Sequence, residues 1–224
     1  MQDFYIFVGM EPLSEVFNSD CIEGMKQYPD KHFDLAIVDP PYGLGSRLID
    51  GGKKGGMGSL RKLADDKVEG WDIAPTEEYF TELKRVSKKQ IIWGGNYFLD
   101  YLGATDGFVV WDKMNGTNPL ADAELAWKSF EGTTRMFRMH HFSAGYEDKI
   151  HPTQKPTKLY EWLLSKYAKQ GDKILDTHLG SGSSRIAAFK RGFNFTAFEI
   201  DKEYFYKQEK RFNDFKSQLV MQFA

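Results

Sequence analysis

Short apolar runs alternate with amphipathic stretches along most of the chain. The runs are rich in β-branched and aromatic residues and end in polar or glycine-containing turns, as buried strands do; they cover residues 16–20, 33–38, 90–93, 107–111, 123–127, 173–176 and 193–198. Apolar positions at helical spacing predict helices over residues 21–30, 76–88, 183–190 and 202–217, and another between Pro156 and Gly171. Because strands and helices alternate, we expect an α/β protein with a mostly parallel sheet.

The composition agrees with one domain over residues 1–224. Hydrophobic residues make up 41% and charged residues 28%, which is enough for a globular core. No stretch approaches the roughly 20 apolar residues of a membrane helix, and residues 1–5 lack the basic start of a secretory signal. Cys21 is the single cysteine, so neither an internal disulfide nor a structural metal site is expected, and a cytoplasmic setting fits best.

Residues 44–72 depart from this pattern because they are too rich in glycine to pack into a core. Between residues 44 and 63, five basic residues and one acidic residue give a net charge of +4, whereas the whole chain carries −2. This predicts a basic, flexible loop that contacts DNA phosphates, with a solvated loop as the alternative. The candidate contacts are Lys53, Lys54, Arg61 and Lys62.

Residues 113–150 form the other stretch with little pattern. Arg135 and Arg138 lie between hydrophobic residues there and are further candidates for DNA contact. The segment is short, so it is a candidate for a small target-recognition insertion.

The four residues Asp39-Pro40-Pro41-Tyr42 follow the apolar run 35–38. The two prolines can continue neither a sheet ladder nor a helix interior, so they stiffen the chain where the strand ends. Ligands of open α/β sheets bind at that end of the strands. A carboxylate and a carbonyl can accept hydrogen bonds from an exocyclic amine, and a tyrosine can stack on the base that carries it. An acidic turn with Tyr42 in the core is the simpler interpretation.

A second group of residues follows the strand that ends at Asp176. Gly180 and Gly182 allow backbone amides to approach a ligand, and Glu199 ends the next strand about 20 residues later, where a carboxylate can bind ribose hydroxyls. Arg185 stands where a dinucleotide motif would have its third glycine, which argues against a nicotinamide oxidoreductase. An acid at the strand end suits a cationic cofactor such as S-adenosylmethionine.

Taken together in order, these motifs resemble the β class of DNA amino-methyltransferases, in which the catalytic half precedes the cofactor half. The resemblance covers nearly the whole chain, through residues 18–21, 34–43, 91–98, 122–127, 151–156, 174–183 and 198–201. It implies a Rossmann-like S-adenosylmethionine-dependent methyltransferase fold with helices on both sheet faces and a circularly permuted motif order.

The resemblance also implies roles for individual residues. Asp39 and the Pro40 carbonyl would accept hydrogen bonds from the target amine, Pro41 completes the motif, and Tyr42 would stack on a base flipped out of the duplex. Asp20 would contact the adenine of the cofactor, and His151, Thr153 and Lys155 would lie near its carboxylate. The complete cofactor set is Asp20, Cys21, His151, Thr153, Lys155, Asp176, His178, Gly180, Ser181, Gly182, Ser183 and Glu199.

Two residues bear on specificity and on cofactor packing. In this family an Asp at the first motif position is found mainly in adenine-N6 enzymes, so Asp39 favours adenine. Proline and phenylalanine commonly follow the acid of the cofactor motif, but here Thr177 and His178 do. We therefore expect weakened or altered cofactor binding rather than its loss.

Several alternatives stay open from the sequence. They are methylation of cytosine N4, of RNA or of a protein glutamine, and a degenerate subunit that binds DNA or cofactor without catalysis. The expected partner is double-stranded DNA, read by a short recognition site or by two subunits, since β-class relatives often form dimers. The chain has no room for a nuclease, so any restriction endonuclease would be a separate protein.

Overall fold

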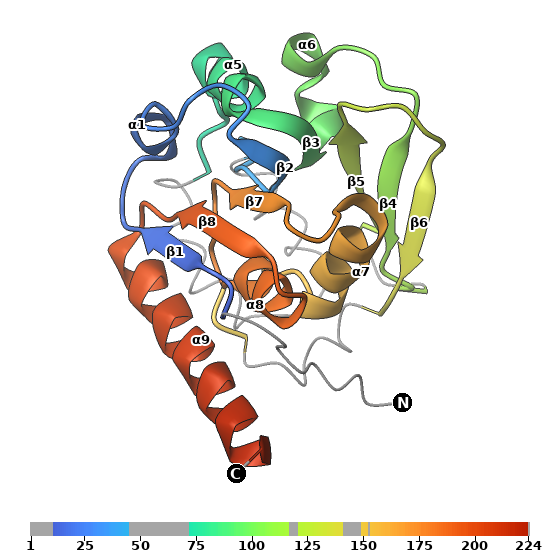
Figure 1. Ribbon diagram of the computed structural model, residues 1–224. Coiled ribbons are helices and arrows are strands. Elements are labelled where there is room, and N and C mark those ends of the chain that lie inside the picture. Colours follow the sequence, from blue (N-terminus) through green and yellow to red (C-terminus); the bar gives the residue numbers. More distant parts are fainter. Residues whose placement is uncertain (1–10, 45–71, 117–120, 141–148, 152, 224) are drawn as a thin grey trace.

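The chain is built around one mixed sheet in the computed structural model, which describes residues 11–44, 72–116, 121–140, 149–151 and 153–223. Within those residues the sheet has eight strands in the order β1-β8-β7-β2-β3-β5-β4-β6 (Figure 1). Their bounds are β1 Ser14–Phe17, β2 Phe33–Val38, β3 Ser87–Trp93, β4 Phe108–Asp112, β5 Ala123–Lys128, β6 Arg135–Arg138, β7 Lys173–Asp176 and β8 Asn194–Phe198.

Strand direction decides which side chains meet. Strands β1, β8, β7, β2 and β3 are parallel, β5 is antiparallel to both β3 and β4, and β6 is parallel to β4. The mostly parallel sheet is therefore confirmed. Because β5 is reversed, its amino end lies at the sheet edge where the other strands have their carboxyl ends.

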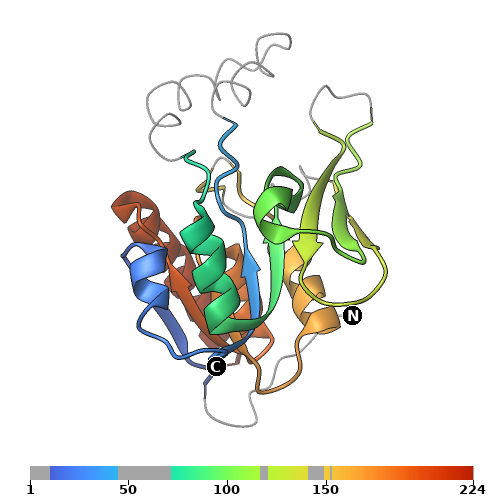
Figure 2. The ribbon, with the colours of Figure 1, turned by 90° about the horizontal axis from the view of Figure 1, so that it is seen from above.

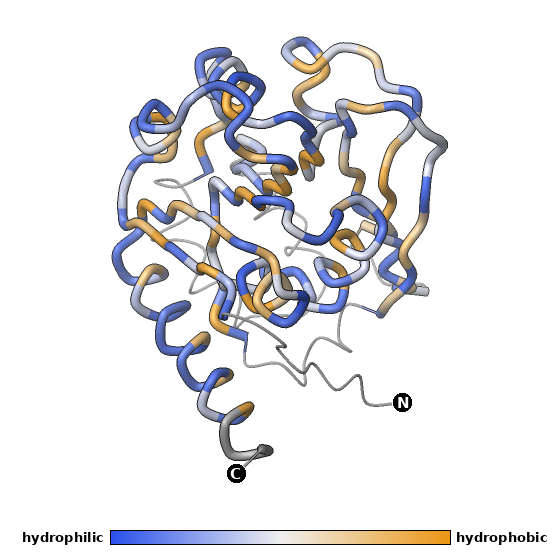
Figure 3. The backbone as a smooth tube through the Cα atoms, viewed as in Figure 1, coloured by the Kyte–Doolittle hydropathy of each residue, from blue (hydrophilic) through white to orange (hydrophobic). Residues whose placement is uncertain are grey.

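Helices cover both faces of the sheet (Figures 1 and 2). One face carries α1 (Cys21–Met25), α5 (Glu77–Val86), the 3₁₀ turn Gly95–Tyr97 and α6 (Leu99–Leu102). The other face carries α7 (Thr157–Tyr167) and α8 (Ser183–Lys190), and α9 (Lys202–Phe223) packs on α8 through Phe212. Much of α9 is hydrophilic (Figure 3), and none of the helices in the described residues is long and apolar enough to span a membrane.

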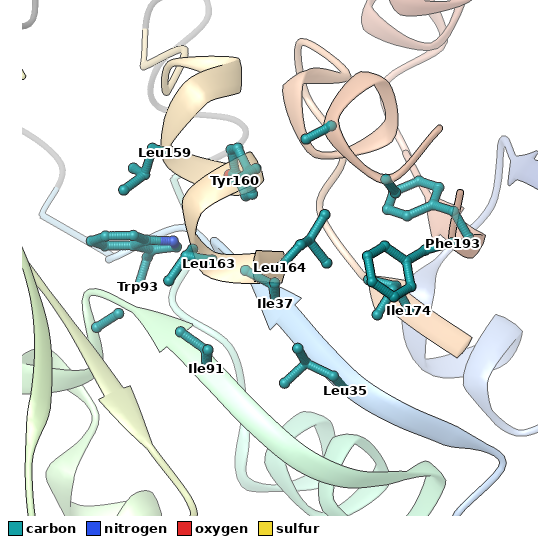
Figure 4. Packing of buried hydrophobic residues seen from close by; sticks show 14 of the residues in the cluster. Leu35, Ile37, Ile91, Trp93, Leu159, Tyr160, Leu163, Leu164, Ile174 and Phe193 are labelled. Atoms are coloured by element: carbon teal, nitrogen blue, oxygen red, sulfur yellow. The ribbon is translucent and has the colours of Figure 1, made fainter. Parts of the chain in front are cut away.

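Alternation along the central strand divides the core into two layers. Leu35 and Ile37 of β2 belong to the layer under α7 and α8, where Leu163 packs close to Ile37 (Figure 4). Ala36 and Val38 belong to the layer under α5. The central position of β2 and the burial of residues 35–38 hold its carboxyl end rigidly in place.

Most predicted elements are confirmed, and the differences have physical causes. The predicted helix over residues 21–30 ends at Met25, because the next residues form turns before Pro29. The final helix extends to Phe223 rather than 217. Strand β6 was not predicted: it has four residues, mostly exposed, and its pairing with β4 carries no local signal.

The structure bears differently on the two stretches without a clear hydrophobic pattern, residues 44–72 and 113–150. Of the predicted basic loop over residues 44–72, residues 45–71 lie outside the described part of the chain. The predicted insertion over residues 113–150 contains β5 and β6, which are integral strands of the sheet. A target-recognition role for the residues around these two strands stays a prediction.

Candidate functional site

Four acidic residues meet at the carboxyl edge of the sheet. Asp20 follows β1, Asp39 follows β2, Asp176 ends β7 and Glu199 follows β8, and these four strands are neighbours. Strands β2 and β7 lie side by side, and the charge of Asp39 contributes to raising the pKa of Asp176. The sheet thus joins the catalytic motif to the predicted cofactor turn.

The side chain of Asp39 is held from two directions. The Tyr42 hydroxyl donates to Oδ1 of Asp39 at 2.8 Å, and the Lys155 ammonium donates to Oδ2. The backbone between them contains Pro40, which is buried, and Pro41, which is half-buried. The carboxylate is therefore fixed in position, and it retains lone pairs that can accept another donor.

Tyr42 lies in an aromatic cluster. Its ring stacks on that of Tyr97, with centroids 5.3 Å apart, and meets the edge of Phe98 at 6.3 Å. Tyr97 is 51% exposed, so the stack reaches the surface beside the catalytic motif. This places an exposed aromatic ring against the one that the sequence assigned to base stacking.

Gly94 determines how closely Tyr42 can approach the sheet. It has φ +65°, and a Cβ there would lie 2.2 Å from the Tyr42 ring. We expect Gly94→Ala to displace Tyr42 and to lower methyl transfer by about 10-fold or more, since a shift of about 1 Å in a positioned group has effects of this size. Steady-state kinetics on the folded variant test this, with Gly103→Ala as control: Gly103 also has positive φ, but nothing lies within 4 Å of its Cβ position. Equal activity of the two variants would contradict the prediction.

Lys155 is a buried cation shared by two carboxylates. Its Nζ atom contacts Asp39 and lies 3.0 Å from Oε2 of Glu124. Burial lowers the pKa of Lys155, but the two carboxylates outweigh burial and raise it, so the ammonium stays charged. The sequence assigned Lys155 to the cofactor carboxylate, whereas the structure places its ammonium against the catalytic motif.

Asp176 is a buried acid with few compensating contacts. Its Oδ2 accepts from the Ser184 hydroxyl at 2.6 Å and its Oδ1 from the His178 amide at 3.1 Å. Burial raises the pKa of Asp176 to about 7 despite these two hydrogen bonds. A cationic group nearby would restore its ordinary acidity.

The glycine-containing turn after β7 is held by the end of β8. Gly180 and Gly182 adopt φ +53° and +76°, which glycine tolerates readily. The Gly180 amide donates to Oε2 of Glu199 at 2.7 Å. Ser181 and Ser183 follow in the turn, with their hydroxyls 3.2 Å apart. The turn and Glu199 therefore form one unit.

His178 and Cys21 lie close together beside this turn. Nε2 of His178 is 4.0 Å from Sγ of Cys21, and Nδ1 is 2.9 Å from the Thr177 hydroxyl. Burial lowers the pKa of His178 to about 4 and raises that of Cys21 to about 12, so both are neutral at pH 7. Asp20 caps α1, accepting from the amide of Ile22 at 2.8 Å.

His151 and Thr153 lie on the far side of the turn. The His151 ring packs on Tyr204, with centroids 4.4 Å apart, and Nδ1 is 3.1 Å from the Thr153 hydroxyl. Burial, reinforced by Lys155, lowers the pKa of His151 to about 4. The Cβ position of Gly180 lies 3.7 Å from the His151 ring, so this ring borders the turn.

The two candidate DNA-binding residues in the described part of the chain, Arg135 and Arg138, are not brought together. Arg138 pairs with Asp112 at 3.2 Å at the carboxyl end of β4, on the site's edge of the sheet. Arg135 lies at the other end of β6 and lines a cavity of about 380 Å³ with Lys128 and Tyr167, away from the site. The remaining four, Lys53, Lys54, Arg61 and Lys62, lie outside the described residues.

Three residues at the site were missed from the sequence. Glu124 and Lys113 extend the charged contacts of Lys155, and Tyr97 extends the aromatic cluster of Tyr42. Glu124 had a signal, because it is an acid inside a predicted strand. Within the described residues, no group of three or more His, Cys, Asp or Glu side chains could hold a metal ion.

Comparison with known proteins agrees with this arrangement. The N6/N4 methyltransferase family, described as DNA methylase, matches residues 109–210. Type II methyltransferase M.HinfI of Haemophilus influenzae is 25% identical over 254 residues, covering 91% of this chain and 69% of that protein.

Solved structures share the fold. The M1.HpyAVI–SAM complex has a TM-score of 0.60 at 22% identity, covering 89% of this chain and 98% of that one. The PvuII cytosine-N4-specific DNA methyltransferase has a TM-score of 0.57 at 14% identity, covering 90% of this chain and 87% of that one. The fold is thus that of S-adenosylmethionine-dependent methyltransferases, and in sequence the chain is similar to N6/N4 DNA methyltransferases, with the family match over residues 109–210.

Proposed function

We propose that this protein transfers a methyl group from S-adenosylmethionine to the N6 amine of adenine in a short sequence of double-stranded DNA, after flipping the base out of the helix. The observation that carries the proposal is the adjacency of Asp39 and Asp176 at the ends of paired parallel strands β2 and β7. One acid belongs to an amine-accepting motif and the other lies in a turn suited to a cationic nucleoside. Methyl donor and acceptor would therefore meet between two rigid strand ends.

The residues of the turn fit the cofactor. Asp176 is buried and its pKa is raised, so it favours a cationic ligand. Gly180 is half-buried and has no side chain to block a ligand, and Glu199 is bonded to its amide with lone pairs to spare for ribose hydroxyls. When bound, S-adenosylmethionine supplies a methyl group on a sulfonium sulfur, which keeps the bonding electron pair when the methyl leaves.

Thr177 and His178 replace the residues common at their positions in the family. The Thr177 hydroxyl lies 2.7 Å from that of Tyr79, and His178 meets the edge of the Tyr79 ring, with centroids 5.3 Å apart. A neutral imidazole held in this way can pack flat against a ligand. We propose that it substitutes for the missing aromatic ring, with altered affinity.

The acceptor side uses the catalytic motif. Asp39 and the Pro40 carbonyl accept hydrogen bonds from the target amine, which orients the nitrogen lone pair for bond formation. The proton that the nitrogen loses as the new N–C bond forms passes to the Asp39 carboxylate and from there to water. The target base stacks on Tyr42, and Tyr97 either moves aside or extends the stack.

The test is transfer of labelled methyl from S-adenosylmethionine to unmethylated duplex DNA, followed by nucleoside analysis. Label in N6-methyladenine is the expected result. Label in N4-methylcytosine would retain the mechanism and overturn the base assignment; the cytosine-N4-specific neighbour is what favours this second candidate. Label in RNA alone, or cofactor binding without transfer, would contradict the proposed substrate or the catalysis.

We also propose that Arg138 contacts DNA phosphate, since it lies at the site's edge of the sheet. The basic residues of the loop over residues 44–72 keep the same predicted role. A homodimer and a separate restriction endonuclease are further proposals; sedimentation of the protein with and without DNA tests the first.

A further inference from the structure

Four charged side chains of alternating sign form a line at the carboxyl edge of the sheet. Lys113 lies 2.5 Å from Oε1 of Glu124, Lys155 lies 3.0 Å from Oε2 of Glu124, and Lys155 also bonds to Asp39. Lys113 directly follows β4, Glu124 lies in β5, and Asp39 directly follows β2. Lys155 lies in the segment before α7. One ammonium is thus shared by two carboxylates, and one carboxylate by two ammonium groups.

Of the inner pair of this line, Lys155 is well shielded from water, whereas the side chain of Glu124 is 23% exposed. The Lys155 side chain is 3% exposed and lies 5.3 Å from the ring centre of Trp93 and 5.9 Å from that of Tyr42. Burial would raise the pKa of Glu124, but Lys155 and Lys113 lower it to about 2. Lys155 and Glu124 are therefore both charged at neutral pH, and the interaction between them is weakly screened.

The line has a consequence for the catalytic carboxylate. An ammonium bonded to a carboxylate neutralises it and weakens it as a hydrogen-bond acceptor. If Lys155 had Asp39 as its single anionic partner, its whole charge would act on the group that must accept from the target amine. Glu124 takes a share of that charge and holds the ammonium between the two carboxylates.

We propose that Glu124 is a positioning residue for methyl transfer: it draws the ammonium of Lys155 partly away from Asp39 and so preserves the accepting capacity of the catalytic carboxylate. The inference rests on the proposed function, because it concerns the same transfer step. Lys113 balances the outer side of Glu124 and does not touch Asp39.

The direct test is Glu124→Gln, which keeps the shape and removes the charge. We expect kcat to fall about 10- to 100-fold, the range for loss of one charged hydrogen bond. The KM for DNA and the Kd for S-adenosylmethionine should change less than about threefold, because Glu124 contacts neither ligand in this assignment. The matched control is Glu161→Gln, which breaks the ion pair of Glu161 with Lys190 on α8 and should leave kcat unchanged.

Two further variants separate this role from a purely structural one. Lys113→Met should leave kcat within about threefold of wild type, because Glu124 then directs its whole charge to Lys155. In a Lys155→Met background, Glu124→Gln should lower kcat by less than about twofold, because the ammonium through which Glu124 acts on Asp39 is absent. If Lys155→Met does not fold, the kcat values of Glu124→Gln and Lys113→Met are compared instead. A loss of kcat in Glu124→Gln without a matching loss in Lys113→Met supports the positioning role of Glu124.

The contradicting outcomes are distinct. Unchanged kcat in Glu124→Gln, an equal loss in Lys113→Met, or full additivity with Lys155→Met would overturn the inference while the wild type still methylates DNA. Absence of transfer by the wild type, with cofactor binding retained, would overturn the proposed function and the inference with it.

Discussion

Asp39→Asn is expected to lower methyl transfer by about 10³-fold or more, the effect of removing a group that stabilises charge where it develops in the transition state. The amide is a weaker acceptor than the carboxylate, so the target amine loses the partner that orients its lone pair. Lys155 keeps Glu124 as a partner at 3.0 Å, so the buried ammonium stays paired and the protein should fold. Single-turnover transfer to duplex DNA measures the effect.

The control for this prediction lies on the same strand. Asp34→Asn makes the identical chemical change near the start of β2, where Asp34 pairs with Lys88 at the surface. It should leave transfer unchanged, and S-adenosylmethionine should still bind to both variants. A fully active Asp39→Asn protein would remove Asp39 from the mechanism.

Asp176→Asn is expected to have opposite effects on stability and on cofactor binding. The acid is buried with a pKa raised from 3.8 to about 7, so its ionised form opposes folding at neutral pH. The penalty above pH 7 is on the order of 4 kcal/mol, and the weaker hydrogen bonds of the amide reduce the net gain to roughly 2 kcal/mol. The same change should weaken S-adenosylmethionine binding by about 100-fold, through loss of the charge opposite the cation.

The pH dependence follows from the direction of this shift. Below pH 3.8 the group is protonated in both the folded and the unfolded states, and it costs no stability. As pH rises from 3.8 to about 7, the unfolded state ionises first, so the wild type loses stability that Asp176→Asn retains. The difference between the two proteins should be small near pH 4 and largest at pH 8.

Denaturant unfolding at several pH values and calorimetric titration of the cofactor measure both effects. Asp100→Asn, at an exposed position of α6, is the control and should change neither quantity. Equal stability of Asp176→Asn and wild type at pH 8, together with unchanged cofactor affinity, would contradict the assignment of Asp176.

The elements with strong local signals were predictable. Leu35 to Val38 is a continuous apolar run closed by Pro40 and Pro41, so both the strand and its end can be identified without any partner. The helix over residues 183–190 agrees with its prediction because Gly182, in the left-handed conformation, marks its start. In these places the stiffness of proline or the conformational freedom of glycine acts within a few residues, so the element can be predicted from the local sequence.

The direction of β5 and the presence of β6 leave no local signal in the sequence. Residues 123–127 are recognisable as a strand, but a strand pattern is the same in either direction, and pairing with β3 and β4 selects the antiparallel one. Strand β6 is mostly exposed and depends on β4 for its hydrogen bonds. For this reason the sequence did not show that residues 135–138 belong to the sheet.

By itself, the sequence determined most of the strand-and-helix order, and it predicted a catalytic motif at Asp39, a cofactor turn after Asp176 and a resemblance to a family. Tertiary structure alone decided which of these groups touch. Lys155 lies 116 residues from Asp39 along the chain, yet it bonds to that carboxylate and shares its charge with Glu124, an acid that the reversed strand β5 carries to the same edge. Long-range contacts of this kind depend on strand order and direction, which are set by packing of the whole sheet and leave no local pattern.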